Sequence, residues 1–170
     1  MEKGKIGAFK QEGLMIPMTI LSGMLKLFEE KDFKKIYKAT KEGGDIWVKN
    51  MKKDYGKMSG QEAVMWSSKL VTFAGWGELN VVSVKPKDST VIYELKNSAL
   101  VETRGKSRKA IDHMTRGLVA GTVTQGFEID AEAVEVCCKA KGDYACRFVV
   151  KEKNSFDKNH PLVKEQLGEL

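Results

Sequence analysis

Three cysteines, all within ten residues, are the side chains of this chain that are best suited to do chemistry. Cys137, Cys138 and Cys146 lie in the run EVCCKAKGDYACRFVV, and the 170 residues hold no other cysteine. An odd number of clustered cysteines does not fit a disulfide framework, so metal binding or a reactive thiol is the chemistry to expect. The alternative without chemistry is packing, because free cysteine is often a small core residue.

The spacing of this run favours metal binding. Glu135, Cys138 and Cys146 follow the pattern Glu-x2-Cys-x7-Cys, with a Gly-Asp turn between the two cysteines. A hairpin brings the residues that flank its turn close together, so both sulfurs could bind one metal ion. Two thiolates and a carboxylate suit a tetrahedral Zn²⁺ site.

A fourth zinc ligand must come from another segment. Asp112 and His113 stand near the start of the preceding predicted helix, and either could complete the site. Cys137 should face the opposite side of the strand from Cys138, so we expect it to be a packing residue.

Two predicted hairpins and a helix position these residues. Strand-like composition spans residues 131–140 and 145–151, around the Gly-Asp turn. An earlier hairpin is predicted at residues 78–85 and 90–96, and an amphipathic helix at residues 109–126 separates the two.

The N-terminal half has helical periodicity. Apolar residues recur at helical spacing over residues 16–29 and again over residues 33–51, where Gly43-Gly44 predicts either two helices or one with a soft point. Ser59 followed by Glu62 predicts the N-terminal cap of a third helix.

These elements describe an α+β domain. N-terminal helices should pack on an antiparallel sheet of about four strands, and the C-terminal order is β-β-α-β-β. We expect one domain over residues 1–153 and a polar tail over residues 154–170 that ends as a short helix or frays. A pocket should form between the layers. Its candidate lining is apolar and comprises Trp47, Trp66, Phe73, Trp76 and Met114.

Composition bounds the partners. The net charge is +6, but basic residues are mixed with acidic ones, which is typical of a solvated surface, so no nucleic acid is expected as a partner. No apolar run reaches the roughly 18 residues of a membrane span. The N-terminal residues lack the order of a secretory signal, which predicts a cytoplasmic protein without stable membrane insertion.

Residues 112–150 resemble the C-terminal signature of the 4-vinyl reductase domain family. That signature runs from a Gly-x-x-Ala-Gly helix through Glu-x2-Cys and Gly-Asp to Cys and Phe. The matching positions are Gly117, Ala120, Gly121, Glu135, Cys138, Gly142, Asp143, Cys146 and Phe148.

The resemblance implies a ligand-binding α+β fold related to the effector domains of aromatic-sensing activators, to haem–nitric-oxide sensor domains and to a Golgi tethering subunit. The aromatic-sensing relatives carry zinc on Cys, Glu, Cys and Cys, of which the last three correspond to Glu135, Cys138 and Cys146. The first cysteine falls at Asp112, where this chain departs from the pattern. Aspartate can bind zinc, but it is a harder ligand than thiolate, so a weak or empty site is the alternative.

Three functions follow from these patterns. The first is a sensor or carrier that binds a hydrocarbon, aromatic or lipid-like molecule and acts as a homodimer. The second is an accessory role in tetrapyrrole vinyl reduction, since the sequence has no GxGxxG motif after a strand and no iron–sulfur cysteine set. The third is a subunit of an oligomeric assembly.

Overall fold

The computed structural model describes residues 6–8, 11–13, 18–29 and 32–168. Its first half is mainly helical, as the periodicity predicts. The elements are β1 (Ile6–Ala8), β2 (Gln11–Gly13), α1 (Met18–Lys26), α2 (Phe33–Tyr55) and α3 (Gly60–Phe73). The short β1–β2 hairpin is not predicted from the sequence, and the expected helix start at residues 16 and 17 lies outside the described residues.

A four-stranded antiparallel sheet forms the second half and confirms the α+β class. Its strands are β3 (Glu78–Lys85), β4 (Thr90–Lys96), β5 (Ala131–Cys137) and β6 (Cys146–Glu152), in the order β3-β4-β6-β5. Between the two hairpins lie α4 (Ala99–Arg104) and α5 (His113–Phe127), and α6 (Pro161–Leu167) follows the sheet. No helix of the described residues is long and apolar enough to cross a membrane.

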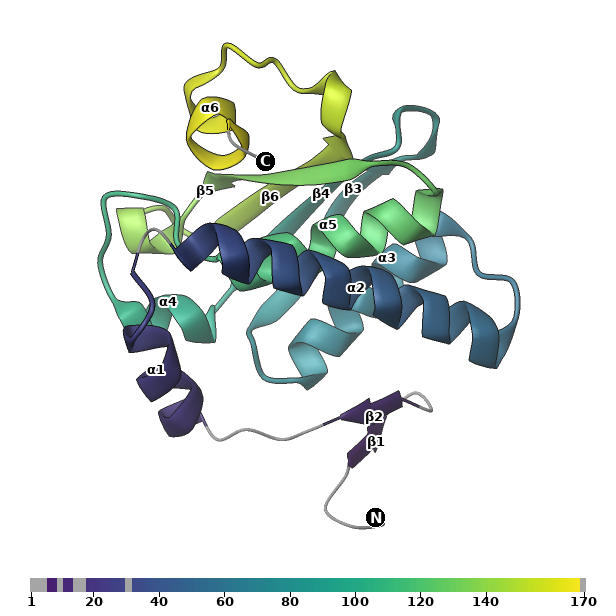
Figure 1. Ribbon diagram of the computed structural model, residues 1–170, viewed down its shortest axis with the longest axis horizontal. Helices are drawn as coiled ribbons and strands as arrows, with labels where there is room; N and C mark the ends of the chain where they lie inside the picture. The colour runs from purple at the N-terminus through teal and green to yellow at the C-terminus, as the bar shows by residue number, and fades with distance from the viewer. Residues whose placement is uncertain (1–5, 9–10, 14–17, 30–31, 169–170) are drawn as a thin grey trace.

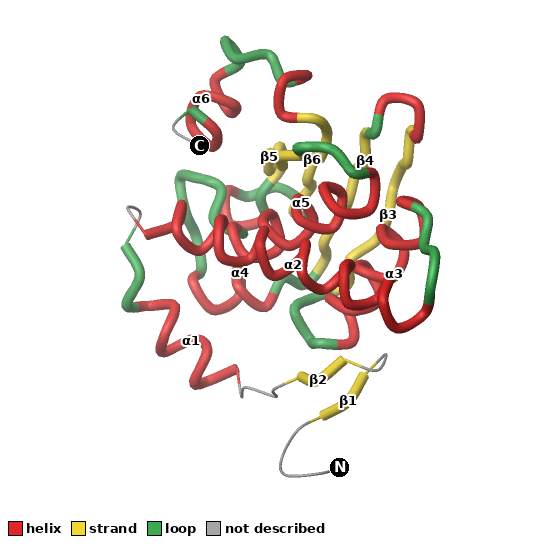
Figure 2. The backbone as a smooth tube through the Cα atoms, turned by 45° about the vertical axis from the view of Figure 1, so that its right-hand side comes forward, coloured by secondary structure: helices red, strands yellow, loops and turns green. Residues whose placement is uncertain are grey.

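One face of the sheet forms the core. Residues alternate along β4 and β6, so Tyr93, Leu95, Phe148 and Val150 are buried on the same face. Helices α5 and α3 pack on this face, and α2 crosses over α5 as an outer layer (Figure 1). The short helix α6 lies beside β5, at one edge of the sheet (Figure 2).

Glycines allow α2 and α5 to pack closely. A Cβ at Gly121 would lie 1.9 Å from the carbonyl oxygen of Lys41, and one at Gly44 would lie 2.4 Å from the carbonyl oxygen of Leu118. The predicted soft point at Gly43-Gly44 is therefore part of one continuous helix, α2, because Gly44 serves as a contact surface for α5 rather than as a break.

Side-chain caps set where the helices begin. Ser59 and Glu62 form the predicted capping box at the start of α3. The predicted helix at residues 109–126 begins only at His113, because Asp112 occupies the N-cap position. Helix α4 is not predicted from the sequence, although Ser98 caps its N-terminus.

Candidate functional site

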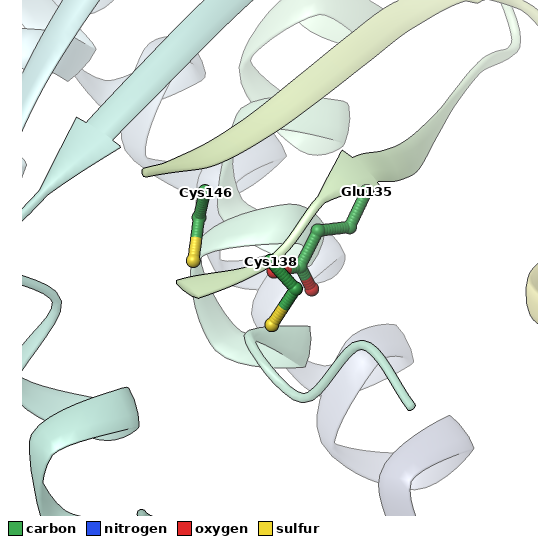
Figure 3. A group of neighbouring side chains, drawn as sticks. All are labelled: Glu135, Cys138 and Cys146. Carbon is green, nitrogen blue, oxygen red and sulfur yellow. The ribbon is translucent and has the colours of Figure 1, made fainter. Parts of the chain in front are cut away.

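Glu135, Cys138 and Cys146 meet at one end of the sheet. Their ligand atoms all lie within 4.8 Å of one another, and all three residues are buried. Figure 3 shows Glu135 and Cys138 projecting from the end of β5 and Cys146 projecting from the start of β6 into the same region. We call these three residues the Cys–Glu group.

A β-bulge makes this meeting possible. Glu135 pairs with Phe148 and Cys137 pairs with Arg147, so two residues of β5 oppose one residue of β6. Strict alternation would place Glu135 and Cys138 on opposite faces of the strand, and the extra residue reverses the alternation between them. Cys137 is half-buried, pairs with an outward residue and lies outside the group.

The Gly-Asp turn holds the two sulfurs in place. Gly142 adopts a φ of 107°, which favours glycine, and the Asp143 carboxylate accepts a 2.7 Å hydrogen bond from the backbone N–H of Cys138. The N–H of Lys139 points at the sulfur of Cys146 at 3.5 Å. The turn therefore orders both cysteines and supplies a donor to one sulfur.

The two thiols divide their protons unequally. A hydrogen bond from Cys146 lowers the pKa of the Cys138 thiol to about 6, although burial opposes that shift. The same contact, together with burial, raises the pKa of the Cys146 thiol. Cys138 is therefore the thiolate of the pair and Cys146 is the hydrogen-bond donor.

Glu135 is an acid held in an apolar environment. Its side chain is almost fully buried, and burial together with the negative charge of Asp112 raises its pKa well above the ordinary value. Oxygen Oε2 accepts a 3.0 Å hydrogen bond from the backbone N–H of Asp112. Oxygen Oε1 is buried and has no hydrogen-bond partner among the described residues.

Asp112 lies beside the Cys–Glu group but not in it. Its carboxylate accepts hydrogen bonds from Ser98 Oγ at 2.6 Å and from the backbone N–H of Thr115 at 3.2 Å. It thereby caps α5 and links that helix to α4. Burial raises the pKa of this carboxyl as well.

His113, the other predicted fourth ligand, is buried against an aromatic ring. Its imidazole lies 4.5 Å from the ring of Phe33, and neither ring nitrogen has a hydrogen-bond partner among the described residues. Burial and the charges of Arg116 and Arg104 lower its pKa to about 3. The imidazole is therefore neutral.

An apolar pocket lies next to these residues, beneath α1. Its volume is about 20 Å³, little more than the roughly 10–15 Å³ that one water needs. We call it the α1 pocket. Its lining is mostly apolar and comprises Leu21, Trp76, Ala99, Leu100, Asp112, Met114 and Thr115.

The structure brings together only two of the five predicted ligand-binding residues. Trp76 and Met114 line the α1 pocket. Trp66 lines a separate hollow under Lys69, and Phe73 is 66% exposed near the end of α3. Trp47 lies on α2, and none of these last three lines the α1 pocket.

Two further residues contact the site and are not predicted from the sequence. Ser98 donates to Asp112, and the side-chain amide of Gln166 on α6 binds the backbone of Glu135. The only sequence signal for Ser98 is its place before a short apolar segment, as an N-cap residue. Gln166 lies in the expected polar tail and has no such signal.

Comparison with known families and structures confirms the resemblance. The model of the vinyl-4-reductase domain family matches residues 91–152, which hold β4, α5, β5 and β6. A search among curated proteins finds no match.

Three solved structures share the fold. The phenol-responsive sensory domain of the transcription activator PoxR, with phenol, has a TM-score of 0.78 and 16% identity over 93% of this chain and 85% of that chain. A vinyl-4-reductase family protein from Methanocaldococcus jannaschii has a TM-score of 0.58 and 19% identity, covering 85% of each chain. Subunit 3 of a trafficking protein particle complex from Naegleria fowleri, covalently bound to palmitic acid, has a TM-score of 0.51 and 14% identity over 79% of this chain and 89% of that chain.

Proposed function

We propose, from the family match over residues 91–152, that this chain binds a small apolar molecule in the α1 pocket and acts in the cytoplasm as a sensor or carrier. One contact carries the proposal. Asp112 lines the α1 pocket, and its backbone N–H donates to Glu135 of the Cys–Glu group. A ligand that enters the pocket would thus contact a residue bonded to the candidate metal ligands.

The class of ligand follows from the pocket lining. The side chains of Leu21, Trp76, Leu100 and Met114 favour hydrocarbon or aromatic groups. The one buried acid, Asp112, could receive a hydrogen bond from a ligand hydroxyl. The phenol bound by the PoxR domain combines both features, which supports an aromatic or similarly small ligand for this chain.

Binding requires α1 to move. A cavity of roughly 150 Å³ holds benzene, whereas the α1 pocket measures about 20 Å³. Helix α1 covers the pocket through Leu21, while its own Ile20, Met24 and the following Leu27 are at least half exposed. A helix with so much exposed apolar surface is held weakly, so its displacement is the opening step that costs least.

We also propose that the Cys–Glu group binds a structural Zn²⁺. Zinc bond lengths of about 2.0–2.3 Å separate tetrahedral ligand atoms by about 3.5 Å, so the group needs only small rotations to close on the ion. The unpartnered Oε1 of Glu135 is the kind of atom that a cation would satisfy. Zinc would hold the β5–β6 turn and the start of α5 together, and its own chemistry there would be structural.

Asp112 stays our proposed fourth ligand, with His113 as the alternative. For Asp112 the carboxylate must use a lone pair beyond those facing Ser98 and Thr115, or exchange one of these hydrogen bonds for the metal. For His113 the ring must leave its stack on Phe33. The smaller movement favours Asp112, so Asp112→Ala should lower zinc affinity more than His113→Ala does.

Signalling would use a homodimer in this proposal. Large apolar side chains are exposed on α2 and α3, outside the α1 pocket, and these are Ile46, Met65 and Phe73. Such residues favour a contact with a second copy of the chain.

Native mass spectrometry of the purified protein tests ligand, metal and dimer together. We expect a wild-type dimer that carries zinc and an apolar mass, whereas Cys138→Ser and Cys146→Ser lose the zinc because each removes a thiolate. Cys137→Ser is the matched control and should keep the metal. Equal zinc content in all four proteins would rule out the metal site, and failure to retain or take up any apolar molecule would count against the pocket.

A further inference from the structure

The free edge of β5 is closed by side chains rather than by another strand. β5 is the last strand of the sheet, so one side of its backbone has no strand partner. The hydroxyl of Tyr37 accepts a 3.2 Å hydrogen bond from the N–H of Ala133. Two residues further along the same edge, Gln166 Oε1 accepts from the N–H of Glu135 at 2.9 Å and Gln166 Nε2 donates to its carbonyl oxygen at 2.9 Å. The side chain of Gln166 thus imitates a neighbouring strand at one residue.

A buried arginine fixes the orientation of Gln166. The Nη1 nitrogen of Arg116 on α5 donates to Gln166 Oε1 at 2.6 Å. Arg116 is only 2% exposed, and its guanidinium lies 4.2 Å from the ring of Tyr37. Because Oε1 receives two donors and Nε2 faces a carbonyl, only one orientation of the amide satisfies all three contacts.

Helix α6 depends on this contact for its position. With seven residues it is too short to be stable on its own. Its apolar contact with the sheet is a small cluster of Val134, Phe156 and Val163, joined by the partly buried Val136, Leu162 and Leu167. Gln166 is the residue of α6 that contacts the Cys–Glu group, through the backbone of Glu135.

We propose that Gln166 is a positioning residue for Glu135 and that α6 responds to metal in the Cys–Glu group. This inference rests on the proposed zinc site. The bulge beside Glu135 interrupts its pairing with β6, so the Gln166 amide holds the backbone where the strand ladder is irregular. A metal bound by the Glu135 carboxylate would fix the same residue from the other side. The two contacts therefore stabilise each other, and the coupling acts in both directions.

The first test measures zinc affinity by competition with a chromophoric chelator, using zinc chloride as the probe. Gln166→Ala should weaken zinc binding about 10–100-fold, the usual effect of losing a residue that orients a metal ligand. Lys164→Ala is the matched control, because Lys164 is exposed on the same helix, and it should bind zinc like the wild type. Gln166→Glu keeps oxygens facing Arg116 but loses the donor to the Glu135 carbonyl, so it should stay folded and still bind zinc more weakly.

The second test measures amide hydrogen exchange in α6 of the wild-type chain, with zinc and with chelator. Zinc should slow exchange across residues 161–167, and Gln166→Ala should abolish that difference. If Gln166→Ala lowers thermal stability but keeps wild-type zinc affinity, Gln166 is merely structural and the inference is wrong, while the zinc site stands. Zinc affinity absent from the wild type itself would instead contradict the proposed site and this inference with it.

Discussion

The carboxylate of Asp112 connects three parts of the molecule at the scale of one residue. It caps α5 through Thr115, accepts from Ser98 at the start of α4, and lies at the base of the α1 pocket. Its backbone N–H binds Glu135. A residue with this many contacts explains how a ligand beneath α1 could alter the Cys–Glu group without touching a sulfur.

His113 makes a prediction about pH. The folded chain holds the pKa of this imidazole at about 3, chiefly through burial, against an ordinary value of 6.5. Below pH 6.5 the unfolded chain therefore binds a proton that the folded chain does not, so His113 lowers stability as the pH falls from 6.5 towards 3. Its contribution should approach about 1.4 kcal/mol per pH unit.

His113→Phe should remove this slope, because phenylalanine keeps the stack on Phe33 and does not titrate. The measurement is urea denaturation between about pH 7 and pH 4 with a chelator present, and the free energy of the variant relative to wild type should rise as the pH falls. A matched change at the exposed His160, His160→Phe, should leave the slope unchanged. Parallel curves for His113→Phe and wild type would show that His113 is not held neutral.

The residues of the Cys–Glu group could be predicted, but the reason they meet could not. Cysteine and glutamate at hairpin spacing, together with the family resemblance, selected Glu135, Cys138 and Cys146. The bulge that turns Glu135 and Cys138 to the same side is set by the pairing of β5 with β6, which no local pattern reveals. Gln166 was missed for a similar reason, since its contact with Glu135 spans 31 residues.

At the scale of elements, the close packing of α2 on α5 positions the site. Gly117 and Gly121 leave room for the backbone of α2 at Tyr37 and Lys41. This contact fixes the axis of α5, and therefore the place of its first residues beside the Cys–Glu group. It also brings Tyr37 to the free edge of β5.

Gly121→Ala should be strongly destabilising. The added Cβ would lie 1.9 Å from a backbone oxygen of Lys41 and 2.7 Å from the backbone nitrogen of Asp45, so the helices must separate. We expect a loss of about 1–3 kcal/mol in the free energy of unfolding, measured by urea denaturation. Gly43→Ala is the control, because its Cβ meets open space on the same helix pair and should gain about 0.5–1 kcal/mol from helix propensity. Equal stabilities for Gly121→Ala and wild type would contradict this packing.

Most elements were predictable because their signals are local. The hairpin at residues 78–85 and 90–96 and the capping box at Ser59 follow from alternation and from cap chemistry, and both are confirmed. Helix α4 was missed because six residues are too few to show a period, and α2 was left as one helix or two because a glycine pair reads as a break until its packing partner is known.

At the scale of the whole molecule, the structure combines a mostly closed apolar pocket with a buried group of metal-ligand side chains, joined at Asp112. Trp76 and Met114 belong to the pocket, whereas the other predicted aromatic residues lie elsewhere. Sequence could supply apolar candidates but could not sort them, because core, surface and pocket positions share the same residue types. The three tryptophans are thereby divided into one probe inside the pocket and two outside it.

The indole N–H resonances of these three tryptophans give the most direct test of the central proposal, that the α1 pocket binds a small apolar molecule. The chain is titrated with phenol and, separately, with benzene, and Trp76→Phe assigns the pocket resonance. We predict a saturable shift at Trp76 with at least one probe, while Trp47 and Trp66 change little. A saturable shift at Trp66 alone, or no saturable shift at Trp76 with either probe, would contradict ligand binding in the α1 pocket.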